Sequence, residues 1–499
     1  MNMIVKTSCG AVEGFVEDGL NKWFGIPYAA PPVSDLRFKR ALPHAPWKGV
    51  KPCKKQGNIP HIFVSNSIVP VAGTQGEDCL HLSIWRPNTE EKLPVYVWIY
   101  GGAYNGGSMS MPGYDGSNFA SKDVVFVSFN YRIGVLGYYD FSPYDREHFD
   151  SNCGVSDQIA ALKWVKENIA AFGGDESNIT LNGESAGGHS VVTMMACPST
   201  KGLFQKAIVQ SAYPRNYFFP ALSKEITDLF LDRLQLRPQD ILKLKTLSVN
   251  DMQEAREFLD LSVPQNWPGK FWPAPVIDDL LPALPEVAFA QGVAADVKLI
   301  LGICRNEGTL FLQMKSQPDS WELVEKMLKT NGYEDKLPAF RSLYGSCGTV
   351  EEQLAQLATE PFLIDSIRIA NAKSLHSDVW MYRFDYAPEA AKAVGLHAAH
   401  AIEIGLALDT VGKDLLATLW TKTPQADVDQ LTGYMHGSWV NFAKTGDPNG
   451  SLPLTWESYD ADKRSTLIFN LEPTLAEKPD EERFRLWENM MLYPDRASL

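Results

Sequence analysis

Residues 183–187, Gly-Glu-Ser-Ala-Gly, form the pattern with the clearest chemical meaning in this sequence. They follow a short run rich in β-formers at 178–182, and no proline occurs after them until Pro198. A strand, Gly-x-Ser-x-Gly and a helix in this order are typical of a nucleophile elbow. Glycine on either side of the serine lets the chain turn sharply, and a helix N-terminus stabilises an oxyanion. Ser185 is therefore the candidate nucleophile.

A serine hydroxyl needs a base to take its proton, and the base needs a further group, usually a carboxylate, to orient it. In hydrolases with such an elbow, the order along the chain is serine, acid, histidine. Glu307 follows a predicted strand at 297–302 and is the candidate acid. Spacing alone does not choose among the later histidines, which are His376, His397, His400 and His436.

An oxyanion hole requires backbone N–H donors from the residue after the serine and from a glycine-rich turn after an earlier strand. Ala186 is the residue after the serine. A predicted strand at 93–100 leads into Gly-Gly-Ala-Tyr-Asn-Gly-Gly-Ser at 101–108, where small residues let the backbone approach an anion closely. We expect Gly102 and Ala103 to be the donors in this turn.

The elements that position these residues are predicted from hydrophobic patterns. Six segments rich in Val, Ile, Phe, Tyr and Trp are predicted strands, namely 93–100, 124–131, 178–181, 206–211, 297–302 and 378–386. Helical patterns lie between them, the clearest at 158–172. Apolar strands of this kind are buried on both faces, which predicts an α/β fold with a mostly parallel sheet flanked by helices. Ligands bind at the carboxyl ends of such strands, where Ser185 is expected.

The chain has 499 residues, of which 45% are hydrophobic and 21% charged, as in ordinary globular proteins with a large core. No linker, repeat or low-complexity tract divides the sequence, so we predict a single domain over residues 1–499. Residues 218–270 and 321–362 are longer than simple crossovers, and we predict that they form helical cap insertions. These insertions either shape the substrate pocket or only add packing helices.

Charge and composition exclude several partners. The net charge of −14 disfavours nucleic acid, because phosphate binding relies on clustered Lys and Arg. Apolar stretches such as 94–100 are far shorter than the roughly 18 residues of a membrane span, so no span is expected.

Residues 1–10 lack the apolar run of a signal peptide, and seven cysteines suit a reducing compartment, so we expect a cytoplasmic protein. Metal-binding patterns are missing, and we expect no metal or cofactor. The oligomeric state is not indicated.

Six further stretches accompany the elbow and are spread over nearly the whole chain. They are Phe-Gly-Ile-Pro-Tyr-Ala-Ala-Pro-Pro at 24–32, Glu-Asp-Cys-Leu-His-Leu-Ser-Ile-Trp at 77–85, Asn-Ile-Ala-Ala-Phe-Gly-Gly-Asp at 168–175, Arg-Asn-Glu-Gly at 305–308, His-Ala-Ile-Glu-Ile at 400–404 and Trp-Val-Asn-Phe-Ala-Lys-Thr-Gly-Asp-Pro-Asn at 439–449. In these motifs the sequence resembles the type-B carboxylesterases, a branch of the α/β-hydrolase superfamily that includes the cholinesterases. In character it is similar to bacterial para-nitrobenzyl-type esterases. The resemblance implies an α/β-hydrolase fold and a serine hydrolase acting on small-molecule carboxylic esters.

The resemblance also implies roles for individual residues. Ser185 matches the nucleophile, Glu307 the acid and His400, in its His-x-x-Glu setting, the base. The oxyanion donors match Gly102, Ala103 and Ala186. The polar residues that resemble a shell around the triad, with a tuning or a structural role, are Glu184, Ser211 and Glu403. The residues that resemble buried ion pairs of the family are Arg37 with Glu77 and Arg132 with Asp157.

The sequence departs from its relatives in ways that bear on substrates. Cys53 and Cys79 align with a disulfide of secreted relatives, which a reducing compartment would leave unformed. No tryptophan lies between them, where cholinesterases bind a quaternary ammonium by cation–π attraction, so choline esters are not expected as preferred substrates. Many relatives have His where this chain has Tyr100, which leaves the backbone donors intact. The Gly-Gly-Ala turn is similar to that of members that accept esters of bulky alcohols.

Two alternatives to an ester hydrolase remain at this point. One is a non-catalytic, esterase-like binding module, although the three triad positions are filled here. The other is an amidase, carbamate hydrolase or thioester hydrolase, because the same tetrahedral chemistry serves all of these substrates. The aromatic residues expected either to line the pocket or to pack in the core are Tyr104, Trp267, Phe271 and Trp272.

Overall fold

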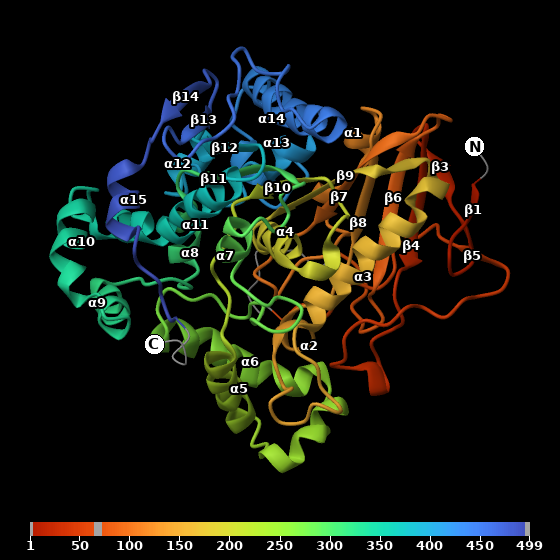
Figure 1. Cartoon of the computed structure of the whole chain (residues 1–499), viewed down its shortest axis with the longest axis horizontal. Coiled ribbons are helices and arrows are strands. Elements are labelled where there is room, and N and C mark those ends of the chain that lie inside the picture. The colour runs from red at the N-terminus through yellow and green to blue at the C-terminus, as the bar shows by residue number, and fades with distance from the viewer. Residues whose placement is uncertain (1–2, 64–71, 495–499) are drawn as a thin grey trace.

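The computed structural model describes residues 3–63 and 72–494; residues 1–2 of the N-terminal segment considered above lie outside this part. Within these residues, eleven strands form one sheet that runs through the molecule (Figure 1) in the order β14-β13-β12-β11-β10-β9-β7-β8-β6-β4-β3. The strands are β3 (Phe15–Glu17), β4 (Leu20–Pro27), β6 (His81–Pro87), β7 (Leu93–Ile99), β8 (Val125–Phe129), β9 (Gly174–Glu184), β10 (Lys206–Gln210), β11 (Lys298–Cys304), β12 (Val379–Phe384), β13 (Ser465–Phe469) and β14 (Thr474–Glu477).

The middle of this sheet is parallel. Each neighbouring pair from β8 through β7, β9, β10, β11 and β12 to β13 runs in the same direction. The antiparallel pairs lie toward the two ends, where β6, β4 and β3 follow β8 and where β14 pairs with β13. The predicted α/β class with a mostly parallel sheet is therefore confirmed.

The six predicted strands all form in the parallel part, as β7 to β12, with ends that differ by a few residues. The largest difference is β9, which begins at Gly174 rather than 178 and ends at Glu184. The antiparallel strands β4 and β6 were not predicted. Their sequences mix polar and apolar residues, and the buried Lys22 of β4 pairs with Glu17 through its amine.

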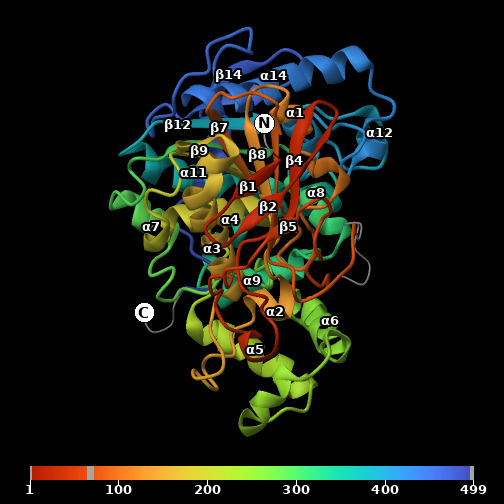
Figure 2. The ribbon, with the colours of Figure 1, turned by 90° about the vertical axis from the view of Figure 1, so that its right-hand side faces the viewer.

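A smaller sheet packs at the N-terminal side of the molecule. In the described part of the chain it contains β1 (Ile4–Lys6), β2 (Ala11–Glu13) and β5 (Val50–Pro52). Figure 2 shows these strands in front of the main sheet, near β4.

Helices cover both faces of the main sheet. In Figure 1, α1 and α14 lie toward the top, and α3 runs across the strands β8, β6 and β4. Both α4 and α14 pack on β7 and β9. The helices around the sheet are α1 (Ser117–Ala120), α2 (Gly134–Tyr138), α3 (Cys153–Asn168), α4 (Ala186–Ala196), α7 (Pro285–Ala290), α8 (Glu307–Gln313), α11 (Val350–Ser374), α12 (Glu389–Ala393), α13 (Ile404–Leu408), α14 (Gln425–Thr445) and α15 (Glu481–Trp487). The short 3₁₀ turns are η1 (Ser34–Leu36), η2 (Pro112–Tyr114), η3 (Ile169–Phe172), η4 (Pro198–Thr200) and η7 (Ala417–Trp420). The predicted helix at 158–172 corresponds to α3 followed by η3.

The two predicted insertions are helical. Residues 218–270 contain α5 (Pro220–Arg233), η5 (Pro238–Lys245) and α6 (Val249–Asn266), which form the lower end of the molecule in Figure 1. Residues 321–362 contain α9 (Trp321–Thr330), η6 (Glu334–Lys336), α10 (Leu337–Tyr344) and the first half of α11. Helix α11 continues beyond residue 362 to Ser374 and packs on β11 and β12. The lower end has an apolar cluster of its own, built around Phe230, Leu259 and Trp272.

The two ion pairs expected from the family resemblance are confirmed. Arg37 Nε lies 2.9 Å from Glu77 Oε2, and Arg132 Nη2 lies 2.7 Å from Asp157 Oδ1. All seven cysteines are free thiols, so Cys53 and Cys79 form no disulfide in this structure. No helix in the described ranges has both the length and the apolar character required to cross a bilayer.

Candidate active site

Ser185 lies between β9 and α4, at the carboxyl edge of the sheet. Its φ of 59° and ψ of −125° are values that an L-residue rarely adopts, so the turn at the serine is strained. The neighbouring strand fixes this turn, because the N–H of Ser185 donates to the carbonyl of Gln210 at the end of β10 at 2.9 Å. The side chain therefore has a defined direction at the start of a helix.

The glycines of the elbow are needed for close approach rather than for their own backbone angles, because the positive φ belongs to Ser185. A Cβ on Gly187 would overlap the carbonyl oxygen of Ile99 at the end of β7. A Cβ on Gly183 would overlap the backbone of Gly187. The turn thus packs without side chains between two strand ends, which explains glycine at both positions.

Ser185, His400 and Glu307 are joined by two hydrogen bonds. Nε2 of His400 lies 2.8 Å from Oγ of Ser185, and Nδ1 of the same ring lies 2.5 Å from Oε2 of Glu307. Glu307 is the first residue of α8, on the turn after β11, and His400 lies in the segment between α12 and α13. All of the side-chain surface of Glu307 is buried, and the side chain of His400 is 5% exposed.

The turn that carries Glu307 and the segment that carries His400 are held together by backbone contacts. The N–H of Asn306 donates to the carbonyl of Ala398 at 2.9 Å. The hydroxyl of Thr309 donates to the carbonyl of Leu396 at 2.8 Å. Residues far apart in the sequence are thereby fixed next to each other.

The other three histidines that the sequence left open lie elsewhere. His376 contacts the carbonyl of Ala290, and the buried His436 contacts the carbonyl of Ala407. His397 is exposed to solvent. Of the four, the hydrogen bonds therefore bring only His400 to Ser185 and Glu307.

Two more carboxylates lie beside the imidazole. Oε1 of Glu184 is 3.2 Å from Nε2 of His400, the nitrogen that also contacts Ser185. Glu403, three residues after His400, accepts a hydrogen bond from Ser211 Oγ at 3.2 Å. Both Glu184 and Glu403 are buried, so three buried glutamates surround one imidazole.

Burial and mutual repulsion shift the pKa values of these groups. Burial raises the pKa of Glu184 to about 8; the charges of Glu403 and Glu307 add to this shift, while His400 opposes it. Burial, and then the charge of Glu307, raises the pKa of Glu403. Burial alone would lower the pKa of His400, but the charges of Glu184 and Glu307 outweigh it and raise this pKa to about 9. The site therefore stabilises a positively charged imidazole.

The loop after β7 adopts an unusual backbone next to the elbow. Gly102, Ala103 and Tyr104 have φ of 115°, 53° and 56°, and the carbonyl of Gly102 accepts the N–H groups of Asn105 and Gly106. A Cβ on Gly101 would lie 2.8 Å from the Cβ of Ser185, so the loop packs directly on the serine turn. Ala186 is the first residue of α4, where a helix leaves its N–H groups without an internal partner.

Aromatic rings flank the imidazole. The ring centroids of Phe311 and Phe362 lie 4.7 and 5.4 Å from that of His400, and these two rings stack on each other. Phe271 packs edge-on against Phe311 at 4.9 Å. Of the four aromatic residues singled out in the sequence, Phe271 is thus connected to the triad through a ring contact.

The other three aromatic residues pack in the core. Tyr104 lies against Tyr138 and its hydroxyl contacts His189. Trp267 and Trp272 belong to the apolar cluster at the lower end of the molecule. Core packing therefore accounts for these three.

Sequence reasoning missed Phe311, Phe362 and Cys304, which contact triad residues or their neighbours. Phe311 follows Glu307 by one helical turn, so its position was available from the sequence. Phe362 lies inside α11 and approaches His400 only through tertiary packing, and no local pattern indicates it.

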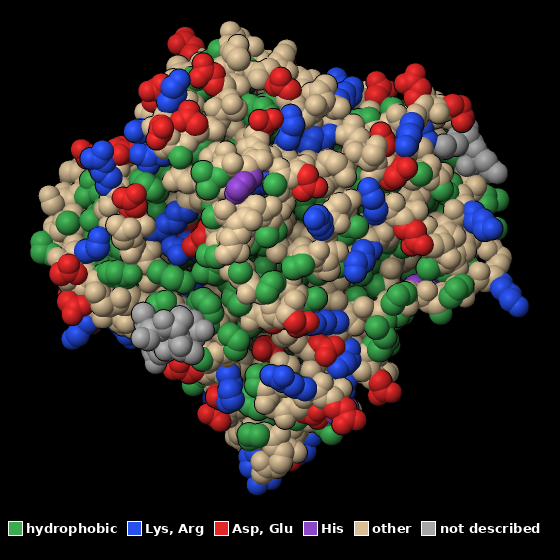
Figure 3. All heavy atoms as spheres, viewed as in Figure 1, with side chains coloured by type: hydrophobic (Ala, Val, Ile, Leu, Met, Phe, Trp, Pro, Cys, Tyr) green, Lys and Arg blue, Asp and Glu red, His purple; other side chains and the backbone are tan. Residues whose placement is uncertain are grey.

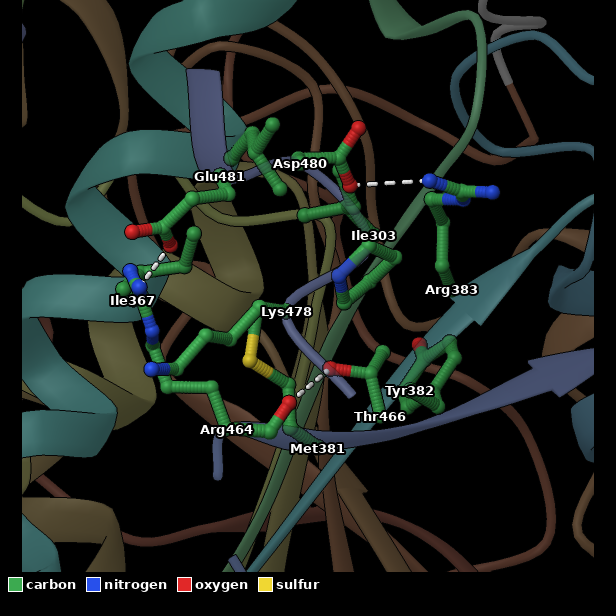
Figure 4. A pocket seen from close by; sticks show the side chains of 12 residues that line it. Ile303, Ile367, Met381, Tyr382, Arg383, Arg464, Thr466, Lys478, Asp480 and Glu481 are labelled. Atoms are coloured by element: carbon green, nitrogen blue, oxygen red, sulfur yellow. Dashed lines mark hydrogen bonds and ion pairs between the residues drawn. The ribbon is translucent and has the colours of Figure 1, made fainter. Parts of the chain in front are cut away.

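Figure 4 shows a separate hollow lined by residues of β12, β13 and α11 and by residues 478–481. Arg383 contacts Asp480 there at 2.8 Å, and Arg464 pairs with Glu481. Four of its charged side chains thus form two ion pairs that connect the sheet to the start of α15. The triad residues do not line this hollow.

Comparisons with known proteins agree with this geometry. The sequence matches the carboxylesterase family over residues 1–487. It is 36% identical over 491 residues to para-nitrobenzyl esterase from Bacillus subtilis (strain 168), with 97% of this chain and 98% of that protein covered. It is 32% identical to phenmedipham hydrolase from Pseudarthrobacter oxydans, with 93% of this chain and 94% of that protein covered. A solved structure of PNB esterase matches with a TM-score of 0.88 at 34% identity, over 99% of this chain and 100% of that chain. The chain therefore belongs to the carboxylesterase family and is a carboxylic ester hydrolase.

Proposed function

We propose that this protein hydrolyses esters through an acyl-enzyme intermediate on Ser185. His400 takes the proton of the Ser185 hydroxyl through Nε2, and the serine oxygen attacks the ester carbonyl carbon. The tetrahedral intermediate then collapses, the bond to the alcohol oxygen breaks, and the imidazolium returns its proton to the leaving alcohol. Water repeats these steps on the acyl-serine and releases the acid.

In this mechanism the N–H groups of Gly102, Ala103 and Ala186 bind the oxyanion. The loop conformation at 102–104 supports the proposal, because the N–H groups of Asn105 and Gly106 close the turn. Those of Gly102 and Ala103 donate to no backbone carbonyl in the described part of the chain and remain for a ligand. Donors fixed by the fold before substrate binds require no reorganisation in the transition state.

Glu307 is proposed to hold the Nδ1–H tautomer of His400 and to stabilise the imidazolium. We propose that Glu184, Ser211 and Glu403 tune this step. The contacts of these residues support this role. Glu184 contacts Nε2 of His400, and Ser211 orients Glu403 by a hydrogen bond. The negative charges favour the imidazolium that forms as the serine attacks.

The observation that carries the proposal is the continuous pair of hydrogen bonds from Ser185 through His400 to Glu307. Its test is the Ser185→Ala variant with p-nitrophenyl acetate as substrate. We expect kcat to fall on the order of 10⁴-fold or more, as for other serine nucleophiles. Near-full activity in a folded variant would contradict the assignment.

Covalent labelling by a fluorophosphonate gives an independent test. The parent enzyme should carry one adduct on Ser185, located by mass spectrometry of its peptides, and the Ser185→Ala variant should carry none. An adduct on another serine would reject Ser185 as the nucleophile. Absence of any adduct would favour a binding module.

We propose that the preferred esters carry an apolar, aromatic group. The stacked rings of Phe311 and Phe362 beside His400 support this, because flat apolar groups pack well on aromatic faces. The name of the Bacillus subtilis relative, para-nitrobenzyl esterase, points to the same class. A panel of esters varied separately in acyl and alcohol groups tests the proposal. Anilide analogues in the same panel measure whether amides are cleaved.

Two further proposals concern the whole chain. The helices at 218–270 and 321–362 are proposed to act as a cap within a single domain. This is supported by the contacts with Phe311 of Phe362, the last residue of the second insertion, and of Phe271, which directly follows the first. We also propose that the protein works in the reducing cytoplasm, supported by its seven free thiols. Thiol titration of denatured enzyme taken from its native cells should find all seven.

A further inference from the structure

A buried thiol lies beside the proposed triad. Cys304 is the last residue of β11, three residues before Glu307, and none of its surface is exposed. Its backbone N–H donates to Oε1 of Glu307 at 2.7 Å. Its Sγ lies 2.8 Å from Oε2 of Glu403. Residue 304 therefore contacts the triad acid through its backbone and a neighbouring carboxylate through its side chain.

The direction of the thiol hydrogen bond follows from the groups around it. Ser211 Oγ lies 3.2 Å from Oε1 of Glu403 but 3.9 Å from Sγ of Cys304, so the hydroxyl donates to the carboxylate. A carboxylate ion only accepts, which leaves the thiol to donate its single proton to Oε2. Burial, together with the charges of Glu403 and Glu307, raises the pKa of Cys304 well above its usual value. The thiol thus keeps its proton.

This hydrogen bond affects the charge of Glu403. Burial and the charge of Glu307 raise the pKa of Glu403, whereas the hydrogen bond from Cys304 lowers it. Charged Glu403 favours the imidazolium of His400, as Glu184 and Glu307 also do.

Burial, and then the charge of Glu184, raises the pKa of Tyr114, so this residue stays neutral. A second tyrosine, Tyr382 of β12, also faces the cluster. Burial, and then the charges of Glu403, Cys304, Glu307 and Glu184, raise its pKa well above its usual value, so Tyr382 stays neutral. The groups of the cluster whose protonation can change its net charge are therefore Glu184, Glu403 and His400.

We propose that Cys304 is a positioning residue for ester hydrolysis. Its thiol holds Glu403 in place and in its charged form, and Glu403 in turn stabilises the imidazolium of His400. The inference rests on the proposed function, because the thiol acts through His400. It assigns a role to a residue that neither the elbow nor the triad motifs include.

The test compares Cys304→Ala with Cys304→Ser, two side chains of similar size of which only serine donates a hydrogen bond. The measurement is kcat/KM for p-nitrophenyl acetate as a function of pH. For Cys304→Ala we expect the acidic limb to move down by about 0.5 pH unit and the plateau to fall about threefold, because Glu403 loses a donor to its charged form. For Cys304→Ser, the acidic limb and the plateau of kcat/KM should both stay near those of the parent enzyme. Identical profiles for the two variants would overturn the proposal.

The Glu403→Gln background tests the route through Glu403. Adding Cys304→Ala to Glu403→Gln should leave the acidic limb where Glu403→Gln alone puts it. A further shift of about 0.5 unit would mean that the thiol acts by another path, and would overturn the proposal. If Cys304→Ala does not fold, the isosteric pair Cys304→Val and Cys304→Thr makes the same comparison between a side chain without a donor and one with it.

Fluorophosphonate labelling separates this inference from the proposed function. If the parent enzyme carries no adduct on Ser185, both fail. If the parent and Cys304→Ala are both labelled on Ser185 but share one pH profile, the positioning role alone fails. If labelling of Cys304→Ala slows about threefold and Cys304→Ser restores it, both are supported.

Discussion

At the scale of residues, the site has more buried negative groups than positive ones. Glu184, Glu307 and Glu403 surround the single imidazole of His400, and burial and repulsion disfavour charge on Glu184 and Glu403. In the proposed mechanism a proton on His400 offsets these negative charges, so moving the serine proton costs less energy than it would without the carboxylates. The carboxylates therefore favour the charge distribution of the transition state over that of the resting enzyme.

The first prediction concerns the pH dependence of activity. The base acts as a neutral imidazole, and the carboxylates raise its pKa above the ordinary value of 6.5, so activity falls as the pH drops through this raised pKa. We expect the acidic limb of kcat/KM above pH 6.5. Glu184→Gln removes the charge that raises the pKa of His400 most, and should move the limb to lower pH.

The control for this prediction is Glu322→Gln, which changes an exposed carboxylate of α9. The acidic limb of kcat/KM for Glu322→Gln should coincide with that of the parent enzyme. A parent limb at or below pH 6.5, or a Glu184→Gln limb that does not move, would show that these charges do not act on the base.

At the scale of elements, the elbow depends on how closely α4 approaches the strand ends. The turn at 183–187 packs backbone against backbone with the ends of β7 and β10. Because protein interiors are densely packed, the cost of one extra methyl group here depends on whether a strand end can move. The hydrogen bonds of the parallel sheet hold both strand ends in register.

The second prediction compares two glycines that would each gain a methyl group. In Gly187→Ala the new Cβ overlaps the carbonyl of Ile99, and we expect a loss of about 3 kcal/mol of unfolding free energy and of most activity. Gly433→Ala, at an exposed position inside α14 with open space around it, should stabilise by about 1 kcal/mol. Chemical denaturation measures both. Equal changes in unfolding free energy for the two variants would mean that the backbone at 183–187 can shift to accommodate the methyl group.

The third prediction concerns the ion pair between Arg132, which follows β8, and Asp157 of α3. Both side chains are buried, so Asp157→Ala leaves an unpaired buried charge and should cost about 3 to 5 kcal/mol of unfolding free energy. In Glu325→Ala the lost pair with Arg341 is half exposed, and the cost should be below about 1 kcal/mol. A small cost for Asp157→Ala, measured by the same denaturation, would contradict the assigned burial.

At the scale of the whole molecule, the C-terminal segment closes back onto the body of the protein. Arg368 of α11 donates to the carbonyls of Trp487, Glu488 and Met490 and pairs with Asp365. The surface carries both signs of charge interspersed, as Figure 3 shows for one face, although the net charge is −14. Attachment of this segment thus involves specific, partly exposed contacts of Arg368.

The fourth prediction tests this attachment with Arg368→Met. The variant loses three carbonyl contacts and leaves Asp365 without its partner, so we expect a loss of about 3 kcal/mol of unfolding free energy. Limited proteolysis should cut first near residues 487–494. Arg485→Ala, which removes an exposed arginine of α15, should change stability by less than about 0.5 kcal/mol. Uniform cleavage along the Arg368→Met chain would contradict a local attachment.

The parallel strands and the order of the triad residues could be predicted because their signals are local. Apolar runs mark β7 to β12, and Gly-x-Ser-x-Gly marks a turn whose shape depends on five residues. The matches to the carboxylesterase family confirm the predicted family and fold. Strands β4 and β6 were missed because their burial comes from partners in the sheet, which their own alternation does not show.

The sequence alone determined the chemistry and the family, because a nucleophile, a set of small residues and a series of motifs are properties of the chain order itself. It left four histidines open until the family resemblance singled out His400. The tertiary structure decided which imidazole meets Ser185 and which glutamates meet that imidazole. It also brought Cys304 to Glu403, 99 positions later in the chain. Contacts of this kind depend on how strands and helices pack, and the pKa values of the site depend on burial that only packing creates.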